Sequence, residues 1–208
     1  DESGTWQNVR PFLGFPGGKT KTIALDISGT LNPRDARLRI VTNMEFAWDA
    51  AWLAVDEPVI TVRELPLKLL RADLHHRGIS QAVHRPGNAP EDYDYDIVVP
   101  GPSWPPLTGR LTRYGDLTPL LTGRDDQLAV FGAGDEMTVV FAVPEEPVPD
   151  GWVRDFVMHN VGWDKDAVLN TVHGSSVEPL PFEAMTVYGE LRPLDDRYET
   201  YLRTYQTR

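Results

Sequence analysis

The stretch WDKDAVLN, residues 163–170, brings three oxygen-bearing side chains close together in the sequence: Asp164, Asp166 and Asn170. Calcium binds about six to eight hard oxygen ligands, and loops of this composition supply them. The stretch lacks the turn glycine and the closing glutamate of a helix–loop–helix calcium site. The three residues are therefore candidate ligands for Ca²⁺. The alternative is that they only satisfy backbone groups in a turn.

Two tryptophans and two tyrosines are candidates for ligand binding, because an exposed aromatic ring stacks well on a sugar. Trp104 lies in the proline-rich stretch PGPSWPP (100–106), where a place in the core is less natural, and its alternative role is to pack under its own loop. Trp163 lies beside the acidic turn. Tyr93 and Tyr95 alternate with acidic residues in EDYDYD (91–96), which predicts a strand with both rings on one face. The alternative for that strand is an ordinary solvated face.

No motif in the sequence marks a catalytic centre. The five histidines include no pair with the spacing of a zinc protease, and no serine lies in a G-x-S-x-G elbow. His173 precedes a Gly-Ser-Ser stretch, but a triad also needs a carboxylate that sequence alone does not place. We therefore name no catalytic residue. The enzymatic alternative is a hydrolase that uses carboxylates or His173.

Composition excludes several classes of protein. The 208 residues carry a formal net charge of −11, which disfavours binding to nucleic acid or to an anionic membrane surface. The absence of cysteine excludes disulfides, thiolate metal sites and cysteine nucleophiles. No apolar run approaches the roughly 18–20 residues that span a bilayer, so we expect no membrane insertion.

Glycine and proline are spread along the whole chain, which favours short strands joined by turns over long helices. Alternation of apolar and polar residues predicts most of the strands, and Trp48 and Trp52 fall in one strand-like region as expected core residues. The turn GAGD (132–135) predicts a hairpin between its two neighbouring strands. A loop-heavy region covers 78–106. The expected strands are 20–28, 37–42, two short ones within 45–55, 59–65, 109–114, 127–131, 136–143 and 153–161; 67–74 fits a strand or a helix, and 197–205 is expected to be helical.

This pattern predicts an all-β protein, an antiparallel β-sandwich of jelly-roll or galactose-binding-like type. We expect a single domain over residues 1–208. Residues 1–19 would form an N-terminal loop segment, and residues 162–208 an irregular C-terminal extension packed on the sandwich through apolar anchors such as Trp163, Phe182 and Tyr188.

The C-terminal stretch also resembles a known group of proteins. The matching pieces are GWVRDF (151–156), GWDKD (162–166), NTVHG (170–174), VEPLPF (177–182) and YLRTYQTR (201–208), with TNME (42–45), WD (48–49) and YDYD (93–96) earlier in the chain. These resemble the C-terminal region of bacterial FG-GAP/VCBS-repeat proteins that carry an ASPIC/UnbV segment, the cartilage-acidic-protein-like group. The propeller repeats and the ASPIC/UnbV segment themselves are absent. The resemblance implies an extracytoplasmic module of a longer chain, without an established activity.

Taken together, the sequence favours a non-catalytic accessory or binding module of a larger exported protein. It would bind a carbohydrate or a partner chain through loops at the rim of the sandwich. The alternatives are the hydrolase described above and a purely structural docking domain, which would expose an apolar patch. Ca²⁺ is the one cofactor that the sequence suggests.

Overall fold

The computed structural model describes residues 5–11, 13, 22–32, 34, 36–42, 48–55, 60–87, 92–101, 107–165 and 172–208. Contacts divide the chain into two compact units. Unit 1 comprises Asp1–Arg63 and His84–Asp92, and unit 2 comprises Glu64–Val83 and Tyr93–Arg208. Whether both units belong to one domain, with the C-terminal extension packed on a sandwich, stays a prediction.

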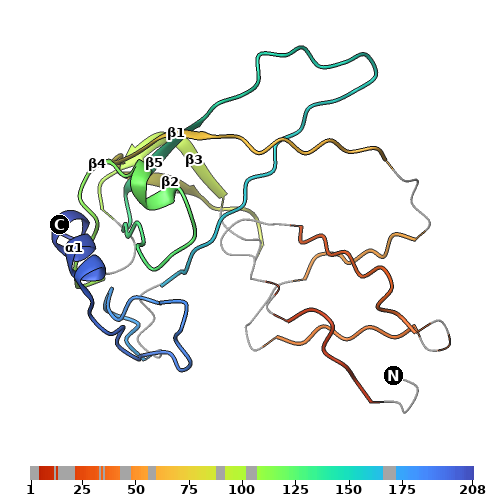
Figure 1. Cartoon of the computed structure of the whole chain (residues 1–208), viewed down its shortest axis with the longest axis horizontal. Helices are drawn as coiled ribbons and strands as arrows, with labels where there is room; N and C mark the ends of the chain where they lie inside the picture. Colours follow the sequence, from red (N-terminus) through yellow and green to blue (C-terminus); the bar gives the residue numbers. More distant parts are fainter. Residues whose placement is uncertain are drawn as a thin grey trace. The chain divides into compact units, whose positions relative to one another are not determined.

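The described part of the chain is β-rich with little helix, as the sequence predicts. Five strands form two antiparallel sheets, a three-stranded one in the order β4-β1-β5 and a two-stranded one of β2 and β3 (Figure 1). The elements are β1 (Leu69–His76), β2 (Ile79–Val83), β3 (Asp92–Val99), β4 (Gly115–Asp116), the 3-10 helix η1 (Thr118–Leu121), β5 (Asp135–Phe141) and the helix α1 (Asp196–Tyr205).

Strand β1 is the centre of the three-stranded sheet. It pairs antiparallel with β5, with Leu74 opposite Met137, and with β4, with Leu74 opposite Gly115. Ala72 and Leu74 are completely buried, so the strand shows the period of two that one covered face requires. The segment 67–74, which fits a strand or a helix by sequence, is therefore a strand here because it has a partner on each edge.

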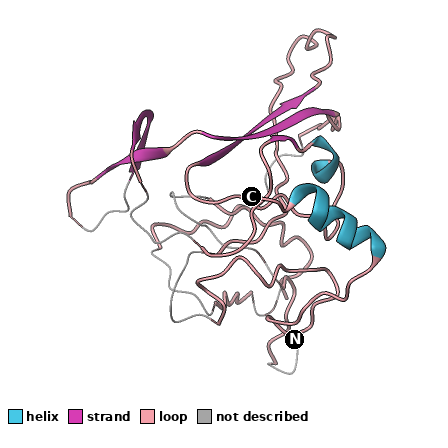
Figure 2. Ribbon diagram, turned by 90° about the vertical axis from the view of Figure 1, so that its left-hand side faces the viewer, coloured by secondary structure: helices cyan, strands magenta, loops and turns pink. Residues whose placement is uncertain are grey.

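The core of unit 2 lies between β1 and the helical elements. Leu74 packs with Leu117 and Leu120 around η1 and with Tyr198 and Tyr201 of α1, and Figure 2 shows both helical segments beside the same sheet. Helix α1 begins where the Asp195 carboxylate accepts a hydrogen bond from the Tyr198 amide at 2.8 Å, the usual N-terminal cap. The two buried tyrosines are three residues apart and so share one helix face.

The end of the chain closes unit 2. Backbone groups of Arg208 exchange two hydrogen bonds with Leu111, at 2.7 and 3.1 Å. The Arg208 guanidinium pairs with the Asp135 carboxylate, whose side chain is only 2 % exposed. It also donates to the Tyr114 hydroxyl at 2.7 Å. These contacts tie the first residue of β5 to the segment that follows α1.

Several expected strands are confirmed and others are wrong. Residues 136–143 and 91–96 correspond to β5 and β3, and 197–205 is helical in α1. The turn at 132–135 forms, but β5 pairs with β1 and not with 127–131. Gly134 has φ +85°, and its carbonyl accepts from both Arg77 and Gly78, which fixes the turn beside the end of β1. Strand β2 lies inside the region expected to be loop-heavy.

The described residues of 20–28, 37–42, 45–55, 59–65, 109–114, 127–131 and 153–161 form no strand. Between 109–114 and 127–131 the reason is visible: the Val130 amide donates to the side-chain hydroxyl of Thr112 at 2.7 Å, where a ladder would use a carbonyl. In the other segments the described apolar side chains are exposed, apart from Ile27, which is half-buried. Trp48 and Trp52, expected in the core, are 62 % and 80 % exposed.

The described residues of unit 1 are held by hydrogen bonds and cation–π contacts between segments distant in sequence. The Arg10 guanidinium donates twice to the Asp26 carbonyl, at 3.1 and 2.8 Å. The guanidinium of Arg39 lies 4.1 Å from the ring centre of Trp6, a cation–π distance. No helix among the described residues is long and apolar enough to cross a membrane.

Candidate functional site

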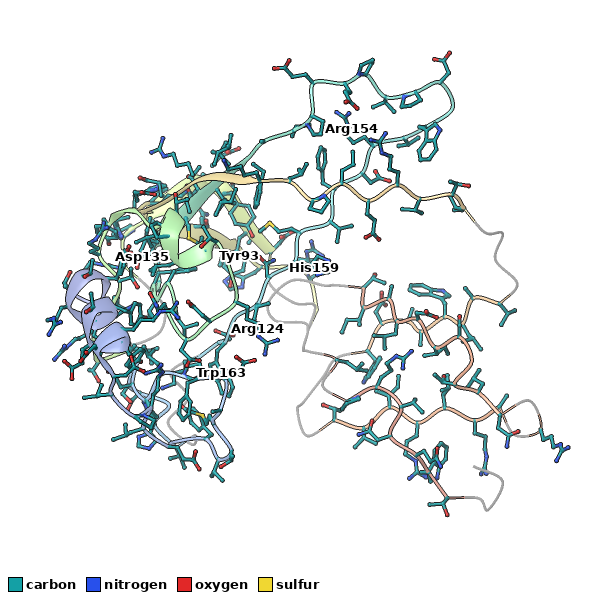
Figure 3. All side chains as sticks on the ribbon, viewed as in Figure 1. Tyr93, Arg124, Asp135, Arg154, His159 and Trp163 are labelled. Atoms are coloured by element: carbon teal, nitrogen blue, oxygen red, sulfur yellow. The ribbon has the colours of Figure 1, made fainter. Side chains whose placement is uncertain are left out.

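Trp163 and Tyr188 form a stacked pair of aromatic rings in unit 2. Their ring centres are 5.5 Å apart and the ring planes differ by 15°. Trp163 remains 57 % exposed, whereas Tyr188 is half-buried. Figure 3 labels Trp163 and shows it well apart from the Asp135 contacts that close unit 2. Tyr188 therefore supports the indole from one side, and the indole presents its remaining surface to solvent.

Lys165 fixes the loop that lies beside this pair. Its ammonium group donates to the carbonyls of Ser176 at 2.8 Å and Val177 at 2.9 Å. The same nitrogen lies 5.6 Å from the ring centre of Tyr188. Trp163 and Lys165 are two residues apart, and both side chains lie against Tyr188. One short segment thus supplies both the stacked ring and the cation that holds its surroundings.

His173 completes the cluster from the opposite loop. Its ring meets Tyr188 edge-on, with ring centres 6.4 Å apart. Its backbone has φ +58°, the one described non-glycine residue in the left-handed region. A Cβ added at Gly189 would lie 3.5 Å from the His173 Nε2 atom, an ordinary contact distance, so the imidazole lies directly beside this glycine. We call Trp163, Lys165, His173 and Tyr188 the aromatic cluster.

The side chains of the aromatic cluster are suited to stacking and hydrogen bonding. An exposed indole fixed by a second ring binds the apolar face of a pyranose, and an imidazole beside it donates or accepts a hydrogen bond. The nearby Ser176 hydroxyl donates to the Glu178 carbonyl at 2.6 Å, so no His173–Ser176 nucleophile pair is formed. The Lys165 ammonium is occupied by backbone oxygens.

The other predicted site residues fall elsewhere. Tyr93 and Tyr95 lie on β3, 40 % and 53 % exposed, and no described ring contact joins them to Trp163. The Tyr95 carbonyl accepts a hydrogen bond from Arg77. Trp104, Asp166 and Asn170 lie outside the described residues. Of the three ligand-binding candidates that the structure describes, Trp163 belongs to the aromatic cluster and Tyr93 and Tyr95 do not.

Of the three predicted calcium ligands, the structure describes one, Asp164. Asp164 is exposed and follows Trp163 directly. The described residues contain no group of three or more His, Asp or Glu side chains placed to hold a metal ion. Because Asp166 and Asn170 are outside the described residues, the calcium site stays a prediction.

The perturbed pKa values of unit 2 belong to structural contacts. Burial acts to raise the pKa of Asp135, but hydrogen bonds from Arg208, the Gly132 amide and Tyr114 outweigh it and hold that pKa below its usual value. Burial raises the pKa of Tyr201, whose hydroxyl donates to the Leu128 carbonyl at 2.8 Å. Neither group belongs to the aromatic cluster. A depression of about 500 Å³ lies beside α1, and its lining includes Arg197 and Asp196. These two side chains carry opposite charges, so the depression does not bring several acidic groups together.

The sequence points to Trp163 and His173 but not to their assembly. Tyr188 is expected only as an apolar anchor, and Lys165 carries no expectation at all. Lys165 and Tyr188 are brought together by loops without regular structure, and no periodic signal encodes such a contact. The composition of GWDKD (162–166), an aromatic residue next to charged ones, is the one available hint.

No protein-family model, curated protein or solved structure matches this chain. The resemblance to FG-GAP/VCBS-repeat proteins therefore stays an interpretation of the sequence.

Proposed function

We propose that this chain is a non-catalytic module that binds carbohydrate through the aromatic cluster. The observation that carries the proposal is the stack of exposed Trp163 on half-buried Tyr188. A large aromatic ring held in one orientation loses little conformational freedom when a ligand binds, and preorganisation of this kind improves affinity.

The polar surroundings support the same proposal. Lys165 holds the loop of His173 through carbonyl oxygens, so the imidazole lies beside the stacked rings in a fixed place. The apolar face of a sugar ring would lie on Trp163, and one sugar hydroxyl would hydrogen-bond to His173. This arrangement combines one large apolar contact with one directional polar contact, which is the pattern of small-molecule sites.

The wider setting is part of the proposal. The module would belong to a larger exported protein, as the sequence resemblance implies, and its sheets would form the predicted antiparallel sandwich. Ca²⁺ bound near Asp164 would then lie next to the aromatic cluster. Calorimetry with and without a chelator tests the calcium part, and absence of binding at millimolar Ca²⁺ would remove it.

One observation favours a second candidate, a docking domain for a partner chain. The stretch 152–163 has no regular secondary structure, and Val153 and Val157 are each 82 % exposed while Phe156 is 65 % exposed. Apolar side chains grouped in this way mark protein–protein contacts in many proteins.

A glycan array followed by calorimetry tests the carbohydrate proposal. Trp163→Ala should weaken binding of the selected glycan by roughly thirtyfold, about 2 kcal/mol, as for a central aromatic residue of an interface. Trp152→Ala is the matched control, because Trp152 is also exposed (43 %) and has no ring contact among the described residues. Trp104→Ala tests the other tryptophan predicted from sequence.

The outcomes separate the candidates. Equal loss of binding in the Trp152 and Trp163 variants would move the ligand to the 152–163 stretch and favour docking of a partner. Binding that depends on Trp104 and not on Trp163 would contradict the assignment to the aromatic cluster.

A further inference from the structure

Asp150 and Gly151 form the one Asp-Gly pair in the sequence. They lie at a turn between β5 and Trp163, in the excursion that Figure 1 shows leaving the sheet after β5. The Trp152 amide donates to the Pro149 carbonyl at 3.0 Å. Gly151 has φ +79°, as the third residue of a type II turn requires.

The Asp150 carboxylate and the Gly151 amide, the two groups that would react at this turn, make no hydrogen bond or ion pair with a described residue. Asp150 and Gly151 are exposed. A Cβ added at Gly151 would meet no atom within 4 Å. Between residues 143 and 165 the described hydrogen bonds are this one from Trp152 to Pro149 and one from the Arg154 guanidinium to the Glu146 carbonyl, each at 3.0 Å, so few contacts resist a rearrangement of the turn.

We propose that Asp150 is a site of spontaneous isomerisation to isoaspartate. The Gly151 nitrogen attacks the Asp150 side-chain carbonyl carbon, and a C–N bond forms. The carboxyl oxygen leaves as water together with the amide proton, which gives a five-membered succinimide. Glycine permits this attack because it has no side chain to block the approach to its nitrogen and because its backbone is freely rotating.

Water then opens the succinimide at either carbonyl. Attack at the side-chain carbonyl restores aspartate. Attack at the main-chain carbonyl breaks the bond from that carbon to the Gly151 nitrogen, so the chain continues through the side-chain carbon and a free carboxylate remains on the main-chain carbon. One water is lost and one is gained, so mass and charge are unchanged and no oxidant or cofactor takes part.

The product changes the turn. The isomer inserts one extra carbon into the backbone between Pro149 and Trp152. The hydrogen bond from the Trp152 amide to the Pro149 carbonyl, which closes the four-residue turn, then no longer has the required geometry. The isoaspartyl carboxylate is also a surface group that a protein carboxyl methyltransferase specific for isoaspartate recognises. This modification is independent of the carbohydrate proposal, because Asp150 and Gly151 make no contact with the aromatic cluster.

Incubation of the folded protein at neutral pH, followed by peptide mapping, tests the proposal. A peptide of unchanged mass containing 150–151 should split into two chromatographic peaks, and the new peak should accept a methyl group from the methyltransferase. Asp150→Glu should abolish the new peak, because a six-membered ring closes far more slowly. Asp150→Asn should accelerate formation of the succinimide, since the side-chain amide loses ammonia and needs no prior protonation of a carboxylate.

Asp116-Leu117 is the internal control. The Asp116 carboxylate accepts from the Thr118 amide at 3.0 Å, and Leu117 is completely buried, so this pair should stay unmodified. If the Asp150 isomer forms in a synthetic peptide of residues 144–156 but not in the folded protein, the turn protects the pair and the proposal is wrong. A new peak that persists in Asp150→Glu would also overturn it.

Discussion

Ile23 and Leu25 of unit 1 are two residues apart, as are Ala72 and Leu74 of unit 2, and either pair would share one face of a strand. Their surroundings are nevertheless opposite. Ile23 and Leu25 are 47 % and 42 % exposed, and Ala72 and Leu74 are completely buried. All the buried residues among those described lie in unit 2. The spacing of the two apolar residues is the same in both units, so the difference in exposure comes from what covers these side chains.

In unit 2 the covering layer comes from distant parts of the chain. Strand β1 receives β5 on one edge and β4 on the other, while Tyr198 and Tyr201 arrive from α1. The described part of unit 1 has no such layer and is held by polar and cation–π contacts that remain in water. Alternation thus permits a strand, and burial of one face stabilises it.

The sharpest test of this contrast is a pair of deletions. Removing residues 195–208 takes away Tyr198 and Tyr201 and the Arg208 contacts, so we expect loss of cooperative thermal unfolding. Removing residues 1–63 leaves the core of unit 2 in place, so we expect this variant to unfold cooperatively on heating. Circular dichroism measures the thermal transition of both deletion variants. A C-terminal deletion that melts cooperatively would show that α1 is not part of the core.

A single side chain makes the same comparison at smaller scale. Leu74→Ala should lower the free energy of unfolding by about 3 kcal/mol, because it leaves a cavity beside Leu117 and Tyr201. Leu25→Ala in unit 1 is the control and should stay within about 0.5 kcal/mol. Chemical denaturation measures both, and equal effects would remove the distinction between the units.

Acid should act on unit 2 through Asp135. Its pKa is held below the usual value, so the ionised carboxylate stabilises the folded state above the unfolded pKa of about 3.9, and this contribution is lost as pH falls through the folded pKa. Asp135→Asn should cost about 2 kcal/mol at neutral pH, the scale of a hydrogen bond to a charged group. The variant should also lose less stability than the parent on acidification.

The control for acid sensitivity is Asp26→Asn. Hydrogen bonds from Ser28 lower the pKa of Asp26, but this carboxylate is exposed, so water screens its contacts. Stability curves from pH 7 to 3 should therefore be nearly parallel for this variant and the parent. If the Asp135→Asn variant and the parent protein also gave parallel curves of stability against pH, this result would contradict a role for the contact between Asp135 and Arg208.

The smallest expected effect is Tyr201→Phe. The hydroxyl of Tyr201 donates to the Leu128 carbonyl at 2.8 Å and accepts from the Gln206 side-chain amide at 2.6 Å. Its loss should cost about 1 kcal/mol, with the ring still filling the core. Urea unfolding measures this free energy. A loss several times larger would mean that α1 is held in the core mainly by the buried hydrogen bonds of Tyr201 and not by packing of its ring.

The sequence is informative wherever local pattern and tertiary burial agree. Asp195 as a cap and the spacing of Tyr198 and Tyr201 encode α1 locally, and the alternation in 136–143 anticipates β5. The pairing of β5 with β1 is not encoded locally, because it depends on Gly134 turning the chain beside Arg77 and Gly78. The expected strands of unit 1 fail for the reason given above.

The candidate site follows the same division. Trp163 is recognisable as an aromatic residue beside charged ones, and His173 stands out as a residue able to hydrogen-bond. The contribution of Tyr188 depends on a stack between irregular loops, and that of Lys165 on two backbone carbonyls ten residues or more away. Loop-to-loop contacts of this kind have no period to detect.

The hydrogen bond between Gln206 and Thr112 joins positions 94 residues apart, and this separation has a consequence for synthesis on the ribosome. Strand β1 and Thr112 leave the exit tunnel long before α1 is translated. Until α1 arrives, Leu74 and Leu117 have no tyrosines to cover them, and the nascent chain exposes an incomplete core. Because contacts distant in sequence slow folding, we expect this chain to need protection from aggregation during translation more than a protein whose core is built from neighbouring segments.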